Sequence, residues 1–290
     1  MNWTKIDQAI SQATSSKFTT TDSLSVGGGC INTAYKISNG KKSYFIKFNH
    51  VDKIDMFVAE QHGLQQIIDS QTINAPQPIV TGITQQNAYI ILEYIKFSNG
   101  SCQTDLGKQL AKMHQQTQNK FGWHINNTIG STEQINQWTD SWVTFWKQHR
   151  LGFQANLAKR NGYAKDLGQE LDRLIEDCHL FFSNHQPEPS LLHGDLWGGN
   201  FSCDPSGNPI IFDPATYYGD RETDVAMTEL FGGFNTTFYR SYQENHPLDS
   251  GYNTRKQLYN LYHILNHLNM FGGSYLAQAK QMTKSLLTEI

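Results

Sequence analysis

The sequence contains little cysteine for its 290 residues, and the cysteines present form no recognisable pattern. The four of them, at positions 30, 102, 178 and 203, are widely spaced and include no CxxC pair. Zinc ribbons and disulfide-stapled secreted domains both need closely spaced cysteines, so the sequence argues against both classes. We therefore expect free thiols and a reducing, cytoplasmic setting.

Long hydrophobic runs and an excess of charge of one sign are also missing. No apolar stretch approaches the roughly 20 residues that cross a bilayer, and the amino terminus lacks the apolar core of a signal peptide. The 23 basic and 26 acidic residues give a net charge of −3, too small to attract nucleic acid or anionic lipid. Hydrophobic residues make up 38% of the chain, which favours a globular protein over a disordered one. We expect a monomer without nucleic-acid or membrane partners.

The first 95 residues are expected to form a small β-rich lobe with one helix inserted after its third strand. Alternating apolar residues bounded by Gly, Asn and Asp turns predict the strands, and an apolar stripe at helical spacing predicts the helix. The predicted strands cover residues 18–26, 33–37, 43–48, 78–81 and 88–93, the inserted helix covers 52–69, and a weaker helix covers 3–14. Asn39-Gly40 favours a hairpin turn, because both residues tolerate positive φ angles.

Residues 96–290 are mostly helical in pattern and are expected to form a second, larger lobe. Helical periodicity covers residues 105–116, 137–150, 163–184 and most of the chain after 223. A turn-rich apolar stretch from Leu191 to Phe212 interrupts these helices, and residues 96–101 are the predicted linker. The sequence thus predicts an α+β fold with two lobes, 1–95 and 96–290, and a ligand cleft between them.

The strongest functional signal lies in the turn-rich stretch of the second lobe. It reads His-Gly-Asp-Leu-Trp-Gly-Gly-Asn over residues 193–200, and Asp213 follows a short apolar run. Asp195 and Asn200 have the spacing of a kinase catalytic loop, in which the aspartate accepts the substrate hydroxyl proton and the asparagine binds a metal. Asp213 would supply another of the hard oxygen ligands that Mg²⁺ prefers. Either loop alone could be an ordinary turn, but the two in this order favour phosphoryl transfer.

The first lobe contains residues that could hold a phosphate chain. Gly27, Gly28 and Gly29 lie between two predicted strands, where a glycine turn can expose N–H groups to phosphate oxygens. This segment matches neither the GxGxxG nor the P-loop pattern, which argues against Rossmann and P-loop proteins.

A lysine on the third predicted strand is the second phosphate-binding candidate. Lys47 can contact the α- and β-phosphates if a carboxylate orients it, and Glu60 on the following helix fits this role better than Asp55. Taken singly, Lys47 and Glu60 could equally be solvated side chains.

Together these segments resemble the fructosamine/ketosamine kinase family, related to aminoglycoside phosphotransferases and choline kinases. The similarity covers nearly the whole chain and is carried by Gly-Gly-Cys-Ile-Asn at 28–32, the segment 193–200, Asp-Pro-Ala-Thr-Tyr-Tyr-Gly-Asp-Arg-Glu at 213–222, Phe-Gly-Gly-Phe at 231–234 and Leu-Asn-His-Leu-Asn at 265–269. The sequence departs from protein kinases, because HGD replaces HRD, Asp-Pro-Ala replaces DFG and no Ala-Pro-Glu follows. Regulation by loop phosphorylation is therefore not expected, and a small substrate is favoured.

The resemblance implies a bilobal protein-kinase-like fold and a specific reaction. ATP, with Mg²⁺, would phosphorylate the third-carbon hydroxyl of a ketosamine, which is the adduct of a sugar with an amine or a protein lysine. The product would then decompose and free the amine, so the activity would be a deglycation repair. The backbone at Glu93, Tyr94 and Ile95 would bind adenine. Asp220 would brace the catalytic loop, with a surface-turn aspartate as the alternative.

Four further residues could bind substrate, hold a metal or react. Trp197, two residues after the expected base, could pack against a sugar ring or belong to the core. His263 and His267 lie four apart on one helix face. Because no further ligands are evident, a packed histidine or a substrate contact, at His267, is favoured over a zinc site. Cys30 would be redox-sensitive if nearby amides and Lys47 lowered its pKa, and inert if buried.

Two other functions stay open on the sequence. The first is a kinase for another alcohol: an aminoglycoside, choline or a plain sugar. A polycationic aminoglycoside would need an acidic wall, and the second lobe shows no acidic run. The second is a nucleotide-binding pseudokinase. Such proteins usually lack the base, a metal ligand or the lysine, whereas Lys47, Asp195, Asn200 and Asp213 are all present.

Overall fold

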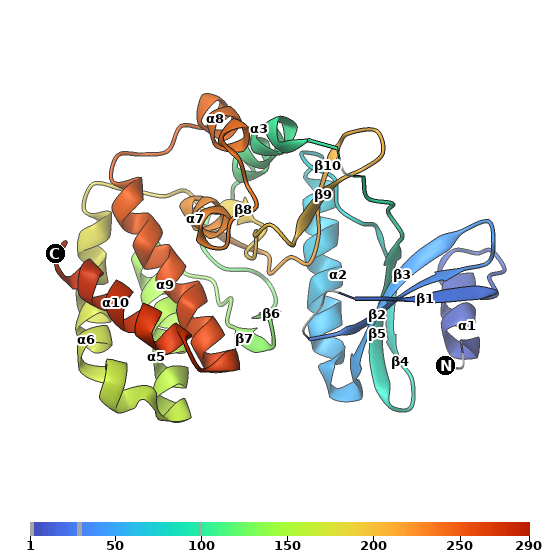
Figure 1. Cartoon of the computed structure of the whole chain (residues 1–290), viewed down its shortest axis with the longest axis horizontal. Helices are drawn as coiled ribbons and strands as arrows, with labels where there is room; N and C mark the ends of the chain where they lie inside the picture. The colour runs from blue at the N-terminus through green and yellow to red at the C-terminus, as the bar shows by residue number, and fades with distance from the viewer. Residues whose placement is uncertain (1–2, 28–30, 99) are drawn as a thin grey trace. The chain divides into compact units, whose positions relative to one another are not determined.

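The computed structural model describes residues 3–27, 31–98 and 100–290 (Figure 1). The chain divides into two compact units: unit 1 comprises residues 1–102 and 201–214, and unit 2 comprises 103–200 and 215–290. The sequence predicted two continuous lobes that meet at residue 95. The two divisions of the chain differ because residues 201–214 hydrogen-bond to the first 102 residues. Ser98 N–H donates to Cys203 O at 2.9 Å, and Ile211 N–H donates to Asn74 O at 3.0 Å.

An antiparallel five-stranded sheet forms the body of unit 1, in the order β1-β2-β3-β5-β4. Its strands are β1 (Asp22–Val26), β2 (Thr33–Ser38), β3 (Ser43–His50), β4 (Pro78–Ile83) and β5 (Asn87–Glu93). Helices α1 (Thr4–Ala13) and α2 (Ile54–Asp69) cover opposite faces of the sheet, and a 3-10 turn, η1 (Val51–Lys53), precedes α2 (Figure 1). The predicted strands and helices of this unit are confirmed within a few residues, except that the first strand begins at Asp22 rather than residue 18.

Each face of the sheet has its own apolar core, because side chains alternate along a strand. Ile46 packs with Ile6 and Ile10 of α1, whereas Phe45 packs against the cluster around Phe57 and Leu64 of α2. Lys47, two residues after Phe45, therefore points to the face that α2 covers.

A short hairpin completes unit 1 from the middle of the chain. Strands β9 (Phe201–Cys203) and β10 (Pro209–Ile211) pair in antiparallel register. The rings of Phe97 and Phe212 stack with their centroids 5.1 Å apart, which adds an apolar contact to the backbone bonds of the linker.

Cys102 and Cys203 form a disulfide, which corrects the prediction of free thiols. The two residues are 101 positions apart in sequence, and the hairpin brings their Cα atoms to 5.8 Å. Both side chains are buried, at 3% and 4% exposure. Cys178 is a free, buried thiol, and Cys30 lies outside the described residues. The cysteines therefore no longer support the expectation of a reducing compartment.

Unit 2 is mostly helical (Figure 1). Its helices are α3 (Gln103–His114), α4 (Trp142–Phe145), α5 (Gly152–Ala158), α6 (Ala164–Asp177), α7 (Glu222–Leu230), α8 (Thr236–Asn245), α9 (Tyr252–Phe271) and α10 (Tyr275–Leu287). Two small antiparallel sheets pair β6 (Asn127–Ile129) with β7 (Thr132–Gln134) and β8 (Ser190–Leu192) with β11 (Tyr217–Gly219). Helix α9 is central to this unit and buries twelve of its twenty residues.

The helix predicted over residues 137–150 begins later than expected and contains a wide turn. It starts at Trp142, continues through a π-helical turn, η2 (Trp146–Leu151), and passes directly into α5. Gly152 follows this turn, and a Cβ there would lie 2.2 Å from the carbonyl oxygen of Lys147. Glycine is therefore required at this position. A second π-helical turn, η3 (Lys159–Tyr163), precedes α6, and a 3-10 turn, η4 (Cys178–Phe182), follows it.

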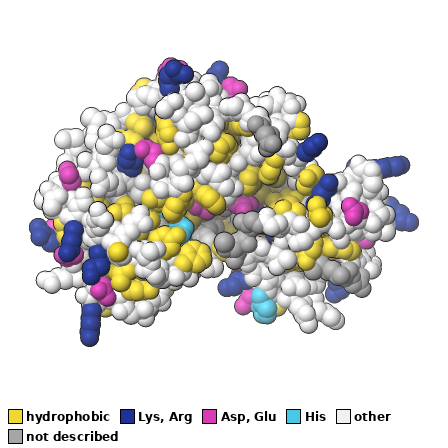
Figure 2. Space-filling model, viewed as in Figure 1, with side chains coloured by type: hydrophobic (Ala, Val, Ile, Leu, Met, Phe, Trp, Pro, Cys, Tyr) yellow, Lys and Arg dark blue, Asp and Glu magenta, His cyan; other side chains and the backbone are white. Residues whose placement is uncertain are grey.

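The predicted α+β class is confirmed, with a β-rich unit that contains the sheet and a helical unit that contains most of the remaining chain. Figure 2 shows charged side chains of both signs interspersed over the face it draws, with hydrophobic side chains gathered between them. No helix in the described ranges is both long and apolar enough to span a membrane.

Candidate active site

Lys47 joins two carboxylates within unit 1. Its Nζ donates to Glu60 Oε1 at 2.7 Å and forms a second, short contact with Asp213 Oδ1. Its side chain is 6% exposed. Burial alone would lower the pKa of Lys47, but the charges of Asp213 and Glu60 outweigh it and raise this pKa. Lys47 is therefore positively charged, and the carboxylate of α2 that contacts it is Glu60 and not Asp55.

Asp213 has an unusual backbone conformation. Its φ angle is +58°, in the left-handed region that residues with a Cβ rarely adopt, and Pro214 follows it. The segment from β10 to Pro214 holds this conformation while the side chain contacts Lys47 and stays 47% exposed. Backbone strain of this kind concentrates at functional sites.

The other nucleotide-binding candidates of unit 1 are only partly described. Gly27 follows β1, and nothing lies within 4 Å of the position that its Cβ would take. Gly28 and Gly29 lie outside the described residues. Glu93 ends β5, where its N–H donates to Gln77 O at 2.8 Å, and Lys36 Nζ lies 4.4 Å from the ring centroid of Tyr94.

A buried carboxylate of α7 holds the loop of residues 193–200 in unit 2. Asp224, 1% exposed, accepts hydrogen bonds from His193 N–H at 2.7 Å and Gly194 N–H at 2.8 Å. Gly194 has a φ of +84°, and a Cβ on it would lie 2.1 Å from the carbonyl oxygen of Ala215. The loop can therefore take this path only with glycine at position 194.

Within the loop, the side chain of Asn200 is fixed by Asp195. Its Nδ2 donates to the backbone oxygen of Asp195 at 2.8 Å and to Asp195 Oδ2 at 3.3 Å. These bonds use the amide nitrogen, so the amide oxygen of Asn200 is the atom left to accept a cation. The spacing of five residues that predicted this pair thus produces a direct contact between the two side chains.

Trp197 lies on the surface of the loop and not in the core, with 40% of its surface exposed. Its ring covers Gly199, where an added Cβ would lie 2.3 Å from a ring carbon. The glycine after Trp197 is similarly constrained, since a Cβ on Gly198 would lie 2.9 Å from Gly232 O. Gly198 and Gly199 therefore allow close packing, because a side chain at either position would collide with its neighbours.

His267 lies on α9 within an aromatic group. Its ring centroid is 4.9 Å from that of Phe231 and 5.1 Å from that of Tyr275, and its Nδ1 contacts the backbone oxygen of His263 at 2.8 Å. Burial lowers the pKa of His267 and, to about 3, that of His263, so both rings are neutral at pH 7. No metal-binding cluster among the described residues includes either histidine.

The interactions described for Asp220 are with residues outside the loop, and its predicted role as a brace stays a prediction. Its carboxylate accepts hydrogen bonds from the hydroxyl of Tyr259 and from Glu222 N–H, and it contacts His185 Nε2 at 2.6 Å. The residue that holds the loop is Asp224, four positions later on α7. Both carboxylates are buried at the start of one helix, and the sequence carried no sign of which one faces the loop.

Asp220 belongs to a buried ionic network that makes stability depend on pH. His185 lies between Asp220 and Asp249, with its Nδ1 2.7 Å from Asp249 Oδ2, and Glu222 and Arg255 complete the charged surroundings. Burial alone would lower the pKa of His185, but its hydrogen bond to Asp220 and the neighbouring negative charge raise it. Protonated His185 therefore stabilises the fold below the unfolded-state pKa of about 6.5, and this contribution is lost as pH rises through the raised folded-state pKa.

We expect His185→Gln to lower the free energy of unfolding more at pH 6 than at pH 9. Urea unfolding of both proteins across this range measures the difference. The other histidines with shifted pKa values titrate in both proteins, so their contributions to the free energy of unfolding cancel when the two proteins are compared. A difference that stays constant with pH would contradict a charged His185.

His114 is a second residue that the sequence did not single out. Its Nε2 lies 3.2 Å from Asp224 Oδ2, and its Nδ1 lies 2.8 Å from the hydroxyl oxygen of Tyr242. Burial lowers the pKa of His114, so the neutral ring donates to Asp224 and accepts from Tyr242. A histidine at the end of an apolar helix is an ordinary sequence feature, which is why only the structure connects it to the loop.

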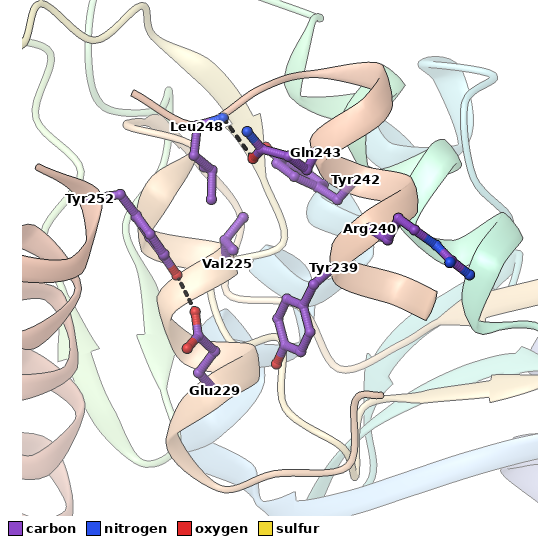
Figure 3. Close-up of a pocket in the computed structure, with 8 residues that line it drawn as sticks. All are labelled: Val225, Glu229, Tyr239, Arg240, Tyr242, Gln243, Leu248 and Tyr252. Carbon is purple, nitrogen blue, oxygen red and sulfur yellow. Dashed lines mark hydrogen bonds between the residues drawn. The ribbon is translucent and has the colours of Figure 1, made fainter. Parts of the chain in front are cut away.

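Unit 2 contains a cavity of about 360 Å³, lined by residues of α7 and α8, by Leu248 of the following loop and by the start of α9 (Figure 3). Its polar groups pair with one another, since the Tyr252 hydroxyl donates to Glu229 at 2.6 Å and Leu248 N–H donates to Gln243 at 3.0 Å. None of the predicted site residues lines it. The cavity is therefore not part of the candidate active site.

The fold and these residues define a kinase-like phosphotransferase. A family model described as "Fructosamine kinase" matches residues 2–289. A "Probable ketoamine kinase" of Synechocystis is 46% identical over 98% of this chain and 97% of its own, and the chloroplastic protein-ribulosamine 3-kinase of Arabidopsis thaliana is 41% identical over 91% and 82%. A solved structure named as a fructosamine-3-kinase, from Haemophilus somnus 129PT, superimposes with a TM-score of 0.92 at 28% identity, covering 98% and 97% of the two chains. The chain belongs to the fructosamine kinase family.

Proposed function

We propose that the protein transfers the γ-phosphoryl group of ATP to the third-carbon hydroxyl of a ketosamine. The observation that carries this proposal is the catalytic loop, in which Asp224 fixes the backbone and Asp195 lies against Asn200. Asp195 is half-buried, so its carboxylate can reach a substrate while the rest of the loop is held in place. In the proposed role, it orients the hydroxyl and accepts its proton as the oxygen attacks phosphorus.

The donor atoms at Asn200 and Asp213 suit a magnesium ion. Asn200 offers its amide oxygen, since its amide nitrogen already donates to Asp195, and Asp213 offers a half-exposed carboxylate. Both groups provide the hard oxygen atoms that Mg²⁺ prefers. Bound Mg²⁺ would neutralise charge on the phosphates during transfer. Lys47 contacts Asp213 in this structure, so we propose that the lysine shifts toward the phosphates when nucleotide binds, while Glu60 keeps it oriented.

The remaining nucleotide contacts are proposed for the backbone of unit 1. Gly27, Gly28 and Gly29 would offer N–H groups to the phosphates. The backbone of Tyr94 and Ile95 follows Glu93, the last residue of β5, and would pair with adenine.

The substrate class is supported by the relatives. Their names give ketoamines and protein-linked ribulosamines as substrates, and the family model spans the chain. We propose that Trp197 and His267 contact the sugar, because one ring is exposed beside the base and the other is partly exposed on α9. A ketosamine phosphorylated at the third carbon would decompose and free its amine, giving a deglycation repair.

The test is ATP consumption with Mg²⁺ across a panel of alcohols: a fructosyl-amine, a ribulosyl-amine, an aminoglycoside, choline and a plain hexose. Turnover with the two ketosamines alone is the expected result, and their relative kcat/KM values rank the sugars. Turnover with another alcohol alone would keep the mechanism and overturn the substrate. ATP binding without turnover on any alcohol would contradict the proposal.

A further inference from the structure

An exposed aromatic surface begins at the catalytic loop of unit 2. Among the described residues of this unit, five large apolar side chains are exposed: Trp138, Leu180, Trp197, Phe231 and Phe271. Phe231 is 40% exposed and Phe271 is 54% exposed, although large aromatic side chains bury well. We call Phe231, His267 and Phe271 the aromatic strip.

The strip is attached to the loop by a close contact between glycines. Phe231 directly follows α7, and the next two residues, Gly232 and Gly233, have φ angles of +76° and +99°. A Cβ on Gly233 would lie 2.7 Å from the Cα of Gly198, so this turn touches the loop through its backbone. Phe231 is thereby fixed beside the segment that carries Asp195.

From this point the strip continues along α9. The ring of His267 lies 4.9 Å from that of Phe231 and 5.7 Å from that of Phe271, centroid to centroid. The histidine donates its Nδ1 proton to His263 O and is neutral, so the strip carries no charge along its length. Phe271 is the last residue of α9, and Gly272 and Gly273 then turn the chain with positive φ angles.

We infer that Phe231 and Phe271 of the aromatic strip bind the chain beyond the amine nitrogen of the ketosamine, and thereby select substrates with a long alkyl or lysyl chain. This inference rests on the proposed function. When the sugar hydroxyl is at Asp195, the amine and its substituent must extend away from the loop, and the aromatic strip starts there. Aromatic rings pack well against the methylene stem of a lysine, which the methylamine adduct lacks.

Two ketosamines that differ only beyond the nitrogen test this inference. Both carry the ketose preferred in the panel; one is the methylamine adduct, and the other is the adduct of a lysine side chain within a short peptide. In Phe231→Ala and Phe271→Ala, we expect kcat/KM for the peptide adduct to fall about fivefold to tenfold, mainly through KM. For the methylamine adduct, we expect a change smaller than about twofold, because it does not reach the strip.

Leu180→Ala is the matched control, since this side chain is 45% exposed in the same unit but lies outside the strip. It should leave both substrates unchanged. Equal losses for the two adducts in the phenylalanine variants, or no loss for either, would overturn the inference while the kinase function stands. No turnover of either adduct by the unaltered protein would overturn the proposed function and this inference with it.

Discussion

Asp195→Asn is expected to reduce ketosamine-dependent ATP turnover by about 10²–10⁴-fold, the usual contribution of a general base. The asparagine has nearly the same shape but cannot accept the proton of the attacking hydroxyl. The loop should keep its path, because the bonds that fix its backbone come from Asp224 and do not involve the side chain at position 195. The loss should therefore appear in kcat, with the Kd for ATP little changed.

Steady-state kinetics and direct nucleotide binding measure the two quantities separately. Asp140→Asn is a suitable control, because it makes the same chemical change in a carboxylate that is 81% exposed and paired only with Lys120. Its kcat should match that of the unaltered protein. Asp195→Asn with near-normal kcat would remove Asp195 from the role of base.

Loss of the Cys102–Cys203 disulfide is expected to lower the free energy of unfolding by about 2–4 kcal/mol. The bond closes a loop of about 100 residues, for which the chain-entropy estimate is somewhat larger, about 4.7 kcal/mol. It also joins the linker before α3 to the hairpin that leads to Asp213. Reduction should therefore shift the urea midpoint downward.

The comparison needs the unaltered protein with and without reductant, and a Cys102→Ser/Cys203→Ser variant. With and without reductant, the double variant should have the urea midpoint of the reduced unaltered protein, so the reductant should not change it. A non-reducing peptide map should contain the two cysteines in one cross-linked peptide. Separate peptides in that map, or a reductant effect that persists in the double variant, would rule out this bond as the source of the stability.

The sequence predicted those parts of the molecule that depend on local pattern. The alternation around Lys47 identified a strand that is half buried, and the helix after it placed Glu60 within 2.7 Å of the lysine. The loop from His193 to Asn200 was recognisable because its residue types stand at the spacing on which the family resemblance rests. The glycines of this loop could be recognised too. The carbonyl group that requires glycine at position 194, however, belongs to Ala215, more than twenty residues away in the sequence.

The features that could not be predicted from the sequence depend on contacts between segments that are far apart in the chain. Asp220 and Asp224 are both buried acids of one short segment, and only the packing of α7 decides that the second one bonds the loop. The disulfide depends on a hairpin that returns to the linker after about a hundred residues. The same hairpin makes residues 201–214 part of unit 1. The local composition of the sequence does not indicate this assignment.

The divided course of unit 1 has a consequence for how the protein is made. Its first segment ends at residue 102 and its second begins at residue 201, so the unit is not complete until residue 214 has left the ribosome. At about 5–20 residues per second, translation reaches that point some 6–22 s after residue 102. Until then, the emerging sheet lacks the hairpin and the partner of Cys102. The amino-terminal unit must therefore finish folding after much of unit 2 has been synthesised, and a ribosome stalled within unit 2 would leave unit 1 incomplete.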